Sequence, residues 1–361
     1  MIITRTPFRI SFFGGGTDYP AWYQEHGGVV LATTIDKYCY ISCRYLPPFF
    51  SHKHRIVYSQ IEIVREITEI KHPAVKAVFE WAGIEKGMEI HHDGDLPARS
   101  GLGSSSAFTV GLLHALSALS GRYISKEELA STAIFIEQKM IREHVGSQDQ
   151  ISAAFGGFNR IEFHQNDTFN VSPVILPGER FEELQRHTML FFTGFSRIAS
   201  EVAKSKIDNF RNREMELNCM KAMVDEAIDI LQNPGDSIDK FGKLLDENWK
   251  FKRGLSDRVT NPEIDHIYDE AKRAGALGGK ILGAGGGGFL LLFVKPELQV
   301  HVRQCLQHLV YVPFKFDNFG SRVIVYQPAQ LTEVSESNEC IFPEGKNVYP
   351  LISDSQSKFE V

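Results

Sequence analysis

The chain has 361 residues, 43% of them hydrophobic and 23% charged, with a formal net charge of −6. At roughly 100–200 residues per domain, this length predicts two domains or one large one, with the composition of an ordinary globular protein. The acidic balance and the lack of a Lys/Arg block argue against a nucleic-acid partner, and no window approaches the ~18–20 apolar residues of a membrane helix.

Residue patterns divide the first half of the chain into strands and helices. Residues 2–13 carry β-branched and aromatic side chains around Pro7, which predicts a strand rather than a signal peptide. Ser125 followed by Glu128 has the pattern of a capping box at a helix start. The other expected strands are 29–45 (one bent strand or two), 88–92 and 158–163, and the expected helices are 73–81, 104–119 and 125–142.

The second half of the chain changes character after a boundary between about residues 165 and 190. A strand at 189–193 is followed by helical stretches at 200–232, 237–254 and 262–274. A glycine cluster and a buried strand come next, and a helix at 297–309 and a strand at 323–326 follow. We therefore expect domains at 1–175 and 176–330, with the polar, aperiodic residues 331–361 as a tail.

The most informative segment is Pro97–Ala107, which reads P-A-R-S-G-L-G-S-S-S-A directly before an apolar helix. Its glycines keep side chains away, while its serines and the first N–H groups of the helix face whatever lies at the helix start. That end carries partial positive charge and unpaired donors, so it suits an anion such as a nucleotide phosphate. The plainer interpretation is a capped helix after a loop, because serine is a favoured cap.

Two further glycine clusters lie at 14–16 and 283–288. Clustered glycines allow the backbone to approach a ligand closely. The second cluster formally satisfies G-x-G-x-x-G, but it continues into a strand instead of opening a helix, which argues against a dinucleotide-binding fold. The chain contains no G-x-x-x-x-G-K-[ST], so a Walker-type loop is excluded.

Taken together, Pro7–Asp18, Pro97–Ala107 and Gly283–Phe289 resemble, in order and separation, the three motifs of the GHMP small-molecule kinases. The resemblance covers about residues 1–330. It implies an α+β fold in which an N-terminal α/β domain precedes a ferredoxin-like C-terminal α+β domain, with the active site between them. It also implies ATP and Mg²⁺ as cofactors and a small-molecule substrate, without nucleic-acid or membrane partners.

The resemblance assigns roles to individual residues. Asp149 matches the catalytic aspartate, and Arg9 matches the cation that pairs with it. Ser105 and Glu137 match the Mg²⁺ ligands, and Asp18 matches an aspartate that hydrogen-bonds sugar hydroxyls. The loop residues that would bind ATP are Pro97, Ser100, Gly101, Leu102, Gly103, Ser104, Ser105, Ser106 and Ala107. The remaining residues that would contact the substrate are Gly15, Gly16, Thr17, Gly285, Gly286 and Arg197.

These residue types suit phosphoryl transfer, which depends on positioning and on neutralising charge. Hydroxyl and carboxylate oxygens are hard ligands for Mg²⁺, and a carboxylate beside the acceptor hydroxyl can accept its proton. Taken singly, each residue also has an ordinary explanation. Asp149 could cap a helix, Glu137 could lie on a solvated helix face, and Arg9 could be a charge at a strand edge.

The motif at Gly14–Asp18 reads G-G-G-T-D where galactokinases carry G-E-H-T-D, which argues against galactose. Together with residues 35–38 and 193–197, it resembles the kinases of this family that phosphorylate the anomeric hydroxyl of D-glycero-D-manno-heptose 7-phosphate for surface glycans. Such a substrate needs a cationic pocket for its remote phosphate, and Arg197, Arg99 and Arg44 are the candidates.

Other functions remain open from the sequence. They are a related kinase of fucose, galactose or another hexose, an ATP-dependent decarboxylase on the same fold, and a nucleotide-binding protein without catalysis. Five cysteines without a C-x-x-C pair favour reduced thiols and a cytoplasmic location. A monomer and a homodimer fit equally well.

Overall fold

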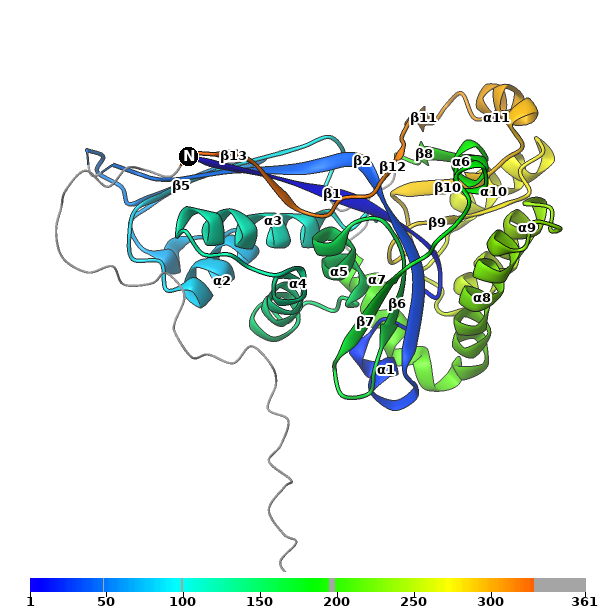
Figure 1. Ribbon diagram of the computed structural model, residues 1–361, viewed down its shortest axis with the longest axis horizontal. Coiled ribbons are helices and arrows are strands. Elements are labelled where there is room, and N and C mark those ends of the chain that lie inside the picture. The colour runs from blue at the N-terminus through cyan, green and yellow to red at the C-terminus, as the bar shows by residue number, and fades with distance from the viewer. Residues whose placement is uncertain (48, 99, 195–198, 328–361) are drawn as a thin grey trace, which may run out of the picture.

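The computed structural model describes residues 1–47, 49–98, 100–194 and 199–327. Within these residues the first of two sheets has nine strands, in the order β13-β1-β2-β5-β3-β4, with β12 and the β6-β7 pair also on β2. Its strands are β1 (Ile2–Phe13), β2 (Gly28–Tyr45), β3 (His54–Val57), β4 (Ile61–Val64), β5 (Met88–Gly94), β6 (Phe158–Phe163), β7 (Phe169–Pro173), β12 (Phe316–Asp317) and β13 (Arg322–Tyr326). Strands β13, β1, β5 and much of β2 cross the upper part of Figure 1, while β6 and β7 lie lower, beside the end of β2 that bends down toward α1 (Pro20–His26).

The long strand β2 organises this sheet. It is one bent strand, and it pairs with β1 along most of its length. Its first part also pairs with β6 and its last part with β5. The register between β1 and β2 shifts at Pro7 and Phe8, where proline supplies no N–H for the ladder. Just beyond this shift, the backbone N–H of Arg9 donates to the carbonyl of Leu102 at 3.0 Å.

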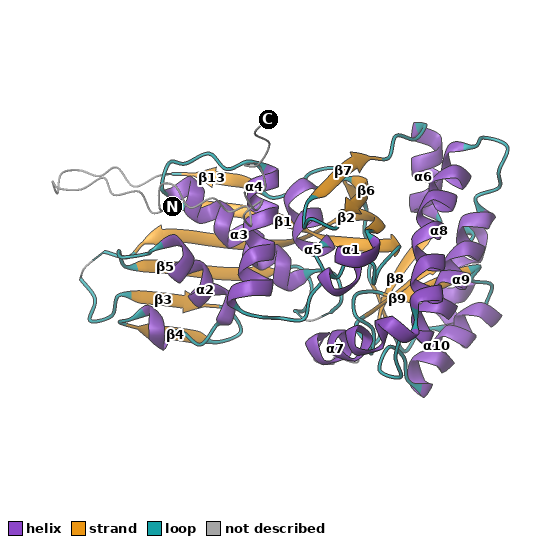
Figure 2. Cartoon of the chain, turned by 90° about the horizontal axis from the view of Figure 1, so that it is seen from below, coloured by secondary structure: helices purple, strands orange, loops and turns teal. Residues whose placement is uncertain are grey.

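Helices cover one face of the first sheet (Figure 2). The central one is α3 (Ser104–Leu119), which packs on β1 and β2 and is buried on nearly all sides. α3 contacts the sheet closely at Gly111, whose carbonyl accepts a hydrogen bond from Thr4 Oγ1 at 2.9 Å and where a Cβ would lie 2.9 Å from Thr6 Oγ1. The other helical segments of this half are α1 (Pro20–His26), a 3-10 turn (Ile67–Glu69), α2 (Pro73–Ala82), α4 (Lys126–Phe135), a π-helical turn (Ile136–Met140) and α5 (Gln148–Phe155).

The second sheet contains β8 (Thr188–Phe192), β9 (Gly278–Ile281), β10 (Phe289–Phe293) and β11 (Val310–Tyr311). All its pairs are antiparallel, and its order is β11-β8-β10-β9. With helices between the first and second strands and between the third and fourth, this is the expected ferredoxin-like arrangement. The helical segments of this half are α6 (Gly178–Arg186), α7 (Ala199–Asn209), a 3-10 turn (Phe210–Asn212), α8 (Glu214–Gln232), α9 (Asp239–Gly254), α10 (Pro262–Arg273), a 3-10 turn (Pro296–Leu298) and α11 (Gln299–Cys305).

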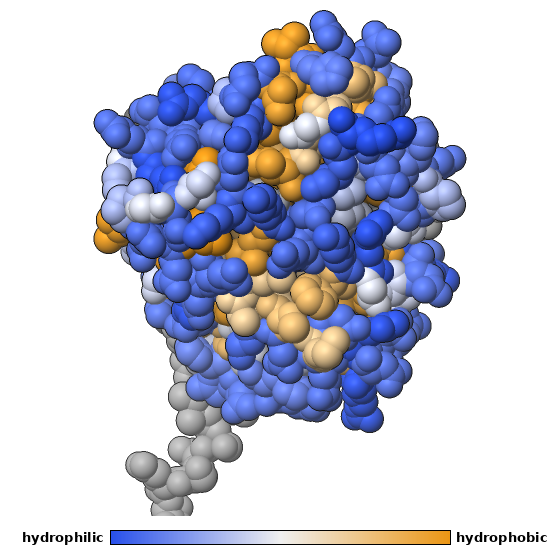
Figure 3. Space-filling model, turned by 90° about the vertical axis from the view of Figure 1, so that its right-hand side faces the viewer, coloured by the Kyte–Doolittle hydropathy of each residue, from blue (hydrophilic) through white to orange (hydrophobic). Residues whose placement is uncertain are grey.

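One apolar core joins the two sheets. Phe12 and Phe13 at the end of β1 both make edge-to-face contacts with Phe241 of α9, and α8 and α9 belong to the same cluster of buried side chains. The right-hand side of Figure 1, where α9, α10 and α11 lie, is mostly hydrophilic with separate apolar areas (Figure 3). This is the pattern of amphipathic helices that bury one side.

Most of the expected elements are present. The strand at 2–13, the helix at 104–119 and the helical stretches after residue 199 are confirmed within one or two residues at most ends, but the stretch 200–232 is divided at residues 210–213. Residues 29–45, expected as one bent strand or two, belong to one strand. Ser125 caps α4 by accepting the N–H of Glu128 at 3.1 Å, but the α-helix ends at Phe135 and a π-helical turn follows. The patterns did not indicate α1, the β3-β4 hairpin, the 3-10 turn at Ile67–Glu69, α5, β7, α6 and the short strands β9, β11 and β12.

The end of the described chain returns to the first sheet. We expected residues 176–330 to form the second domain, but β12 pairs with β2, and β13 pairs with β1 at the opposite side of the molecule from β8. These pairings join residues more than 280 positions apart, so no local pattern could indicate them. The predicted tail at 331–361 lies outside the described residues. No described helix combines the length and the apolar character needed to cross a bilayer.

Candidate active site

A cavity of about 220 Å³ lies where the loops of both sheets meet. Its walls come from the end of β1, the turn after it, the start of α3, the loop before α5, and α7. Lys252 of α9, Lys280 of β9 and the residues Gly283 and Ala284 complete it. Segments from both halves of the sequence therefore enclose one space.

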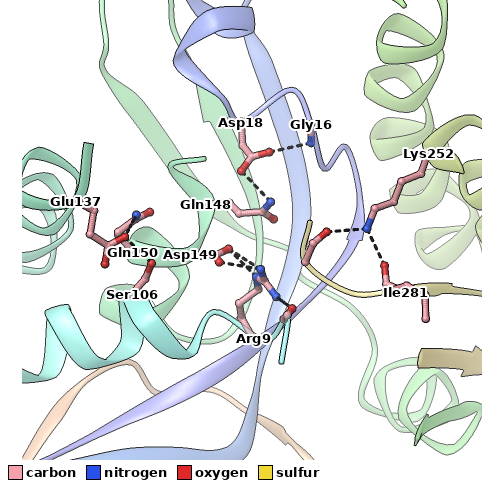
Figure 4. A network of polar contacts seen from close by, with 12 residues as sticks. Arg9, Gly16, Asp18, Ser106, Glu137, Gln148, Asp149, Gln150, Lys252 and Ile281 are labelled. Carbon is pink, nitrogen blue, oxygen red and sulfur yellow. Dashed lines mark hydrogen bonds and ion pairs between the residues drawn. The ribbon is translucent and has the colours of Figure 1, made fainter. Parts of the chain in front are cut away.

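An ion pair between Arg9 and Asp149 forms one wall of the cavity (Figure 4). Arg9 Nε donates to Asp149 Oδ1 at 2.8 Å and Nη2 donates to Oδ2 at 2.8 Å, while Nη1 donates to the carbonyl of Gly101 at 2.7 Å. The Arg9 side chain is 4% exposed and that of Asp149 is 26% exposed. Asp149 lies in the first turn of α5, where the helix end favours a negative charge.

Glycines shape the start of α3 beside this pair. Gly103 precedes the first residue of the helix with φ at 76°, a left-handed conformation that favours glycine. A Cβ at this position would lie 3.3 Å from Arg9 Cγ and 3.4 Å from Asp149 Cγ. A Cβ at Gly101 would lie 2.6 Å from the carbonyl oxygen of Leu282, so this loop also contacts the glycine-rich turn of the second sheet. The first turn of α3, Ser104–Ser106, faces the cavity.

Asp18 is a buried residue in the lining of the same cavity. Its Oδ1 accepts the N–H of Gly16 at 2.8 Å, and its Oδ2 accepts from Gln148 Nε2 at 2.8 Å. Burial raises the pKa of this carboxyl above its usual value, and the hydrogen bonds from Gly16 and Gln148 oppose the rise. A Cβ at Gly146 would lie 1.9 Å from Asp18 Oδ2, which explains the glycine at that position.

Glu137 lies behind the first turn of α3 and is 1% exposed. Its Oε2 accepts from Ser106 Oγ at 2.8 Å and from Gln150 Nε2 at 2.5 Å. Burial raises the pKa of Glu137 to about 7. Its Oε1 has no hydrogen-bond partner among the described residues. A buried carboxylate with one unused oxygen beside serine hydroxyls fits the hard oxygen ligands of Mg²⁺. Ser106 is the serine that donates to Glu137, while Ser105, the expected Mg²⁺ ligand, lines the cavity.

The cavity also contains three buried lysines that the sequence patterns did not indicate. Lys206 and Lys252 are each 3% exposed, and Lys280 is 1% exposed. Burial lowers the pKa of Lys206 to about 8 and that of Lys280 to about 7, and it lowers the pKa of Lys252 well below its usual value. Of the three, only Lys280 lies close to a motif, three residues before the glycine cluster at 283–288.

The structure brings most of the expected site residues together. Those that line the cavity are Arg9, Gly15, Gly16, Asp18, Gly101, Gly103, Ser104, Ser105, Ser106 and Asp149. Those that lie outside its lining are Thr17, Pro97, Ser100, Leu102, Ala107, Glu137, Gly285 and Gly286.

Several of the residues outside the lining have structural contacts. The hydroxyl of Thr17 donates to the carbonyls of Gly14 and Val29, and the carbonyl of Ser100 accepts from the N–H of Phe289. Arg44, a candidate for the remote phosphate, instead pairs with Glu89 on the first sheet, away from the cavity. Arg99 and Arg197 lie outside the described residues.

Comparison with known proteins identifies the family to which this chain belongs. Residues 67–157 match the family described as GHMP kinases N terminal domain, and residues 235–309 match GHMP kinases C terminal. A D-glycero-alpha-D-manno-heptose 7-phosphate kinase of Campylobacter jejuni is 30% identical over 85% of this chain and 93% of its own length. An L-fucokinase/L-fucose-1-P guanylyltransferase of Bacteroides fragilis is 27% identical over 84% of this chain, but the match covers only 35% of that longer protein.

Among solved structures, a D-glycero-D-manno-heptose 1-phosphate kinase from Bacteroides thetaiotaomicron superposes with a TM-score of 0.75. It is 26% identical, and the match covers 91% of this chain and all of that one. A sugar kinase structure from Campylobacter jejuni, described as putative by its authors, has a TM-score of 0.67 at 26% identity, over 89% of this chain and 97% of that one.

The buried lysines predict a pH dependence of stability. Because the pKa of Lys280 is about 7 when folded and near 10.5 when unfolded, the unfolded chain binds more protons between these values. Stability attributable to this group therefore rises with pH above about 7, by at most about 1.4 kcal/mol per pH unit. Urea denaturation at pH 7.5 and 9 gives the free energy of unfolding of the wild type and of Lys280→Met. The difference between the two proteins isolates the contribution of Lys280, because the contributions of other titrating groups cancel.

We expect the stability of the wild type to rise relative to Lys280→Met over this range. Lys204→Met, which removes an exposed lysine of α7, is the control and leaves the pH dependence unchanged. An equal change in the free energy of unfolding between pH 7.5 and 9 for wild type and Lys280→Met would mean that the buried amine is not neutralised by folding.

Proposed function

Since the chain belongs to the GHMP kinase family of phosphotransferases, we propose that it transfers the γ-phosphate of ATP to the anomeric hydroxyl of D-glycero-D-manno-heptose 7-phosphate. The products are ADP and the 1,7-bisphosphate, a precursor for nucleotide-activated heptose. The observation that carries this proposal is the Arg9–Asp149 pair beside the start of α3, in a cavity rich in buried lysines. The identity to a heptose 7-phosphate kinase over most of both chains supports the choice of sugar.

Asp149, which lines the cavity and has a side chain that is 26% exposed, is the proposed acceptor of the proton from the sugar hydroxyl. In the proposed reaction, the anomeric oxygen loses its proton to the Asp149 carboxylate and forms a bond to the γ-phosphorus. The bond from that phosphorus to the bridging oxygen of ADP breaks, and the electron pair leaves with ADP. Arg9 holds both oxygens of Asp149 in one plane, which fixes the direction of the carboxylate.

The start of α3 supplies the groups that bind triphosphate. The first N–H groups of a helix have no partner within the helix, and the helix dipole favours an anion there. Gly101 and Gly103 leave this end free of side chains. The proposed ATP site is therefore the loop 97–107, with the residues that line the cavity nearest to the phosphates.

Asp18 is the proposed partner of a sugar hydroxyl, together with the backbone of Gly15 and Gly16. Ser105 and Glu137 are the proposed residues for Mg²⁺, which neutralises phosphate charge when it is bound. Glu137 must be ionised to serve in this way. Its pKa of about 7 implies that cation binding is favoured as the pH rises through neutrality.

The substrate is tested by measuring ADP release with a panel of acceptors. We expect turnover with D-glycero-D-manno-heptose 7-phosphate and little with unphosphorylated heptose, fucose or galactose. Equal or better turnover with fucose would favour a hexose kinase instead, and the similarity to a fucokinase makes fucose the most informative competitor.

Asp149→Asn separates catalysis from nucleotide binding. Removing a general base typically costs about 10²–10⁴ in rate, so we expect that loss in kcat with an unchanged Kd for ATP. Asp225→Asn is the matched control, because Asp225 also pairs with an arginine, Arg160, but is 63% exposed at the surface. Full activity of Asp149→Asn would remove the aspartate from the mechanism.

Gly103→Ala tests whether the start of α3 must fit closely against the ion pair. Gly121, after the other end of the same helix, has a φ of 72° and nothing within 4 Å of an added Cβ. Both alanine variants carry the left-handed strain of about 1–2 kcal/mol. We expect kcat to fall only in Gly103→Ala, by roughly tenfold or more, because the added Cβ displaces Arg9 and Asp149. Equal kinetics of the two variants would contradict this fit.

A further inference from the structure

The three lysines of the cavity differ in what their amines contact. Lys252 Nζ donates to the carbonyls of Ile281 and Gly283 at 2.7 and 2.8 Å. Lys280 Nζ donates to the carbonyl of Phe12 at 2.7 Å. These two amines therefore fasten the glycine-rich turn and the end of β1. Lys206 Nζ has neither a hydrogen bond nor an ion pair with any described residue, although its side chain is as deeply buried.

Helix α7 holds Lys206 against the cavity. Ala203 lines the same cavity one turn earlier. Phe210, one turn later, packs with Tyr19 and Trp22 in a small apolar cluster that anchors this face. Lys206 Nζ lies 5.1 Å from the centre of the Tyr19 ring. The position of this amine is thus fixed by packing, while Lys204 on the same helix is exposed.

No carboxylate among the described residues forms an ion pair or a hydrogen bond with Lys206. Arg9 occupies both oxygens of Asp149, and the oxygens of Asp18 accept from Gly16 and Gln148. Burial lowers the pKa of Lys206, although the charges of Asp18 and Asp149 favour its protonated form. A buried ammonium group without a partner is unfavourable, and a bound anion would satisfy it.

We propose that Lys206 binds the remote phosphate of the acceptor and so selects phosphorylated sugars over free sugars. This inference rests on the proposed sugar phosphate kinase function. Lys206 Nζ lies beside the ring of Tyr19, which directly follows Asp18, the proposed partner of the sugar. The charges of Asp18 and Asp149 both act on Lys206. The amine is therefore near the residues proposed to bind the acceptor, where a second phosphate would supply its counterion.

Steady-state kinetics with heptose 7-phosphate and with unphosphorylated heptose test this role. Lys206→Met removes the charge while keeping the length of the side chain, and Lys204→Met is the control on the exposed side of α7. Because a hydrogen bond to a charged group is worth the equivalent of about 10- to 150-fold in affinity, we expect Lys206→Met to raise KM for the sugar phosphate by that factor. The KM values for ATP and for the free sugar stay nearly unchanged.

Three kinetic results would overturn the assignment. They are an unchanged KM for the sugar phosphate, an equal rise for the free sugar, and an equal rise for ATP. Lys206→Gln provides a second neutral variant, and thermal unfolding shows that both variants are folded. Removal of an unpaired buried charge is expected to keep or raise the melting temperature.

If the wild type phosphorylates no sugar phosphate, the proposed function fails, and calorimetric titration with inorganic phosphate then decides the role of Lys206. Binding by wild type and Lys204→Met, with loss in Lys206→Met, supports an anion site at Lys206. No binding by wild type, or equal binding by Lys206→Met, overturns it.

Discussion

The site depends on the ion pair between Arg9 and Asp149. It joins β1 to the first turn of α5, two elements that are 140 residues apart in the sequence. The third arginine contact, to the carbonyl of Gly101, connects the same group to the loop before α3. One guanidinium therefore fixes the strand, the loop and the helix that surround the cavity. A lysine has no planar fork and could not make all three contacts in this geometry.

Close approach of backbones is the second requirement. A Cβ at Gly101 or Gly283 would enter the backbone of the opposite loop, and one at Gly288 would lie 2.2 Å from the carbonyl of Ser100. These contacts join the start of α3 to the second sheet. Lys252 and Lys280 add hydrogen bonds to the carbonyls of Ile281 and Phe12 near this junction. The burial of the three amines and of Asp18 is unfavourable for folding, which is typical of sites that bind a charged ligand.

Sequence patterns could predict the parts of this arrangement that are local. The strand around Pro7, the bent strand β2 and the helix after G-L-G-S-S-S-A follow from periodicity and turn residues, and the family resemblance added Arg9, Asp18 and Asp149. The lysines could not be predicted, because Lys206 and Lys252 lie in helices with many charged residues and only tertiary packing distinguishes buried from exposed ones. The same reason explains Arg44, which has the right chemistry but pairs with Glu89 elsewhere. The contact of Ser106 with Glu137 depends on the rotation of α3, which residue order alone does not specify.

A crystal structure with Mg²⁺, a non-hydrolysable ATP analogue and heptose 7-phosphate is the most direct measurement. The account predicts the γ-phosphate at the first turn of α3, with the anomeric hydroxyl within hydrogen-bond distance of Asp149 on the opposite side. A triphosphate bound elsewhere, or an acceptor hydroxyl that does not contact Asp149, would contradict it.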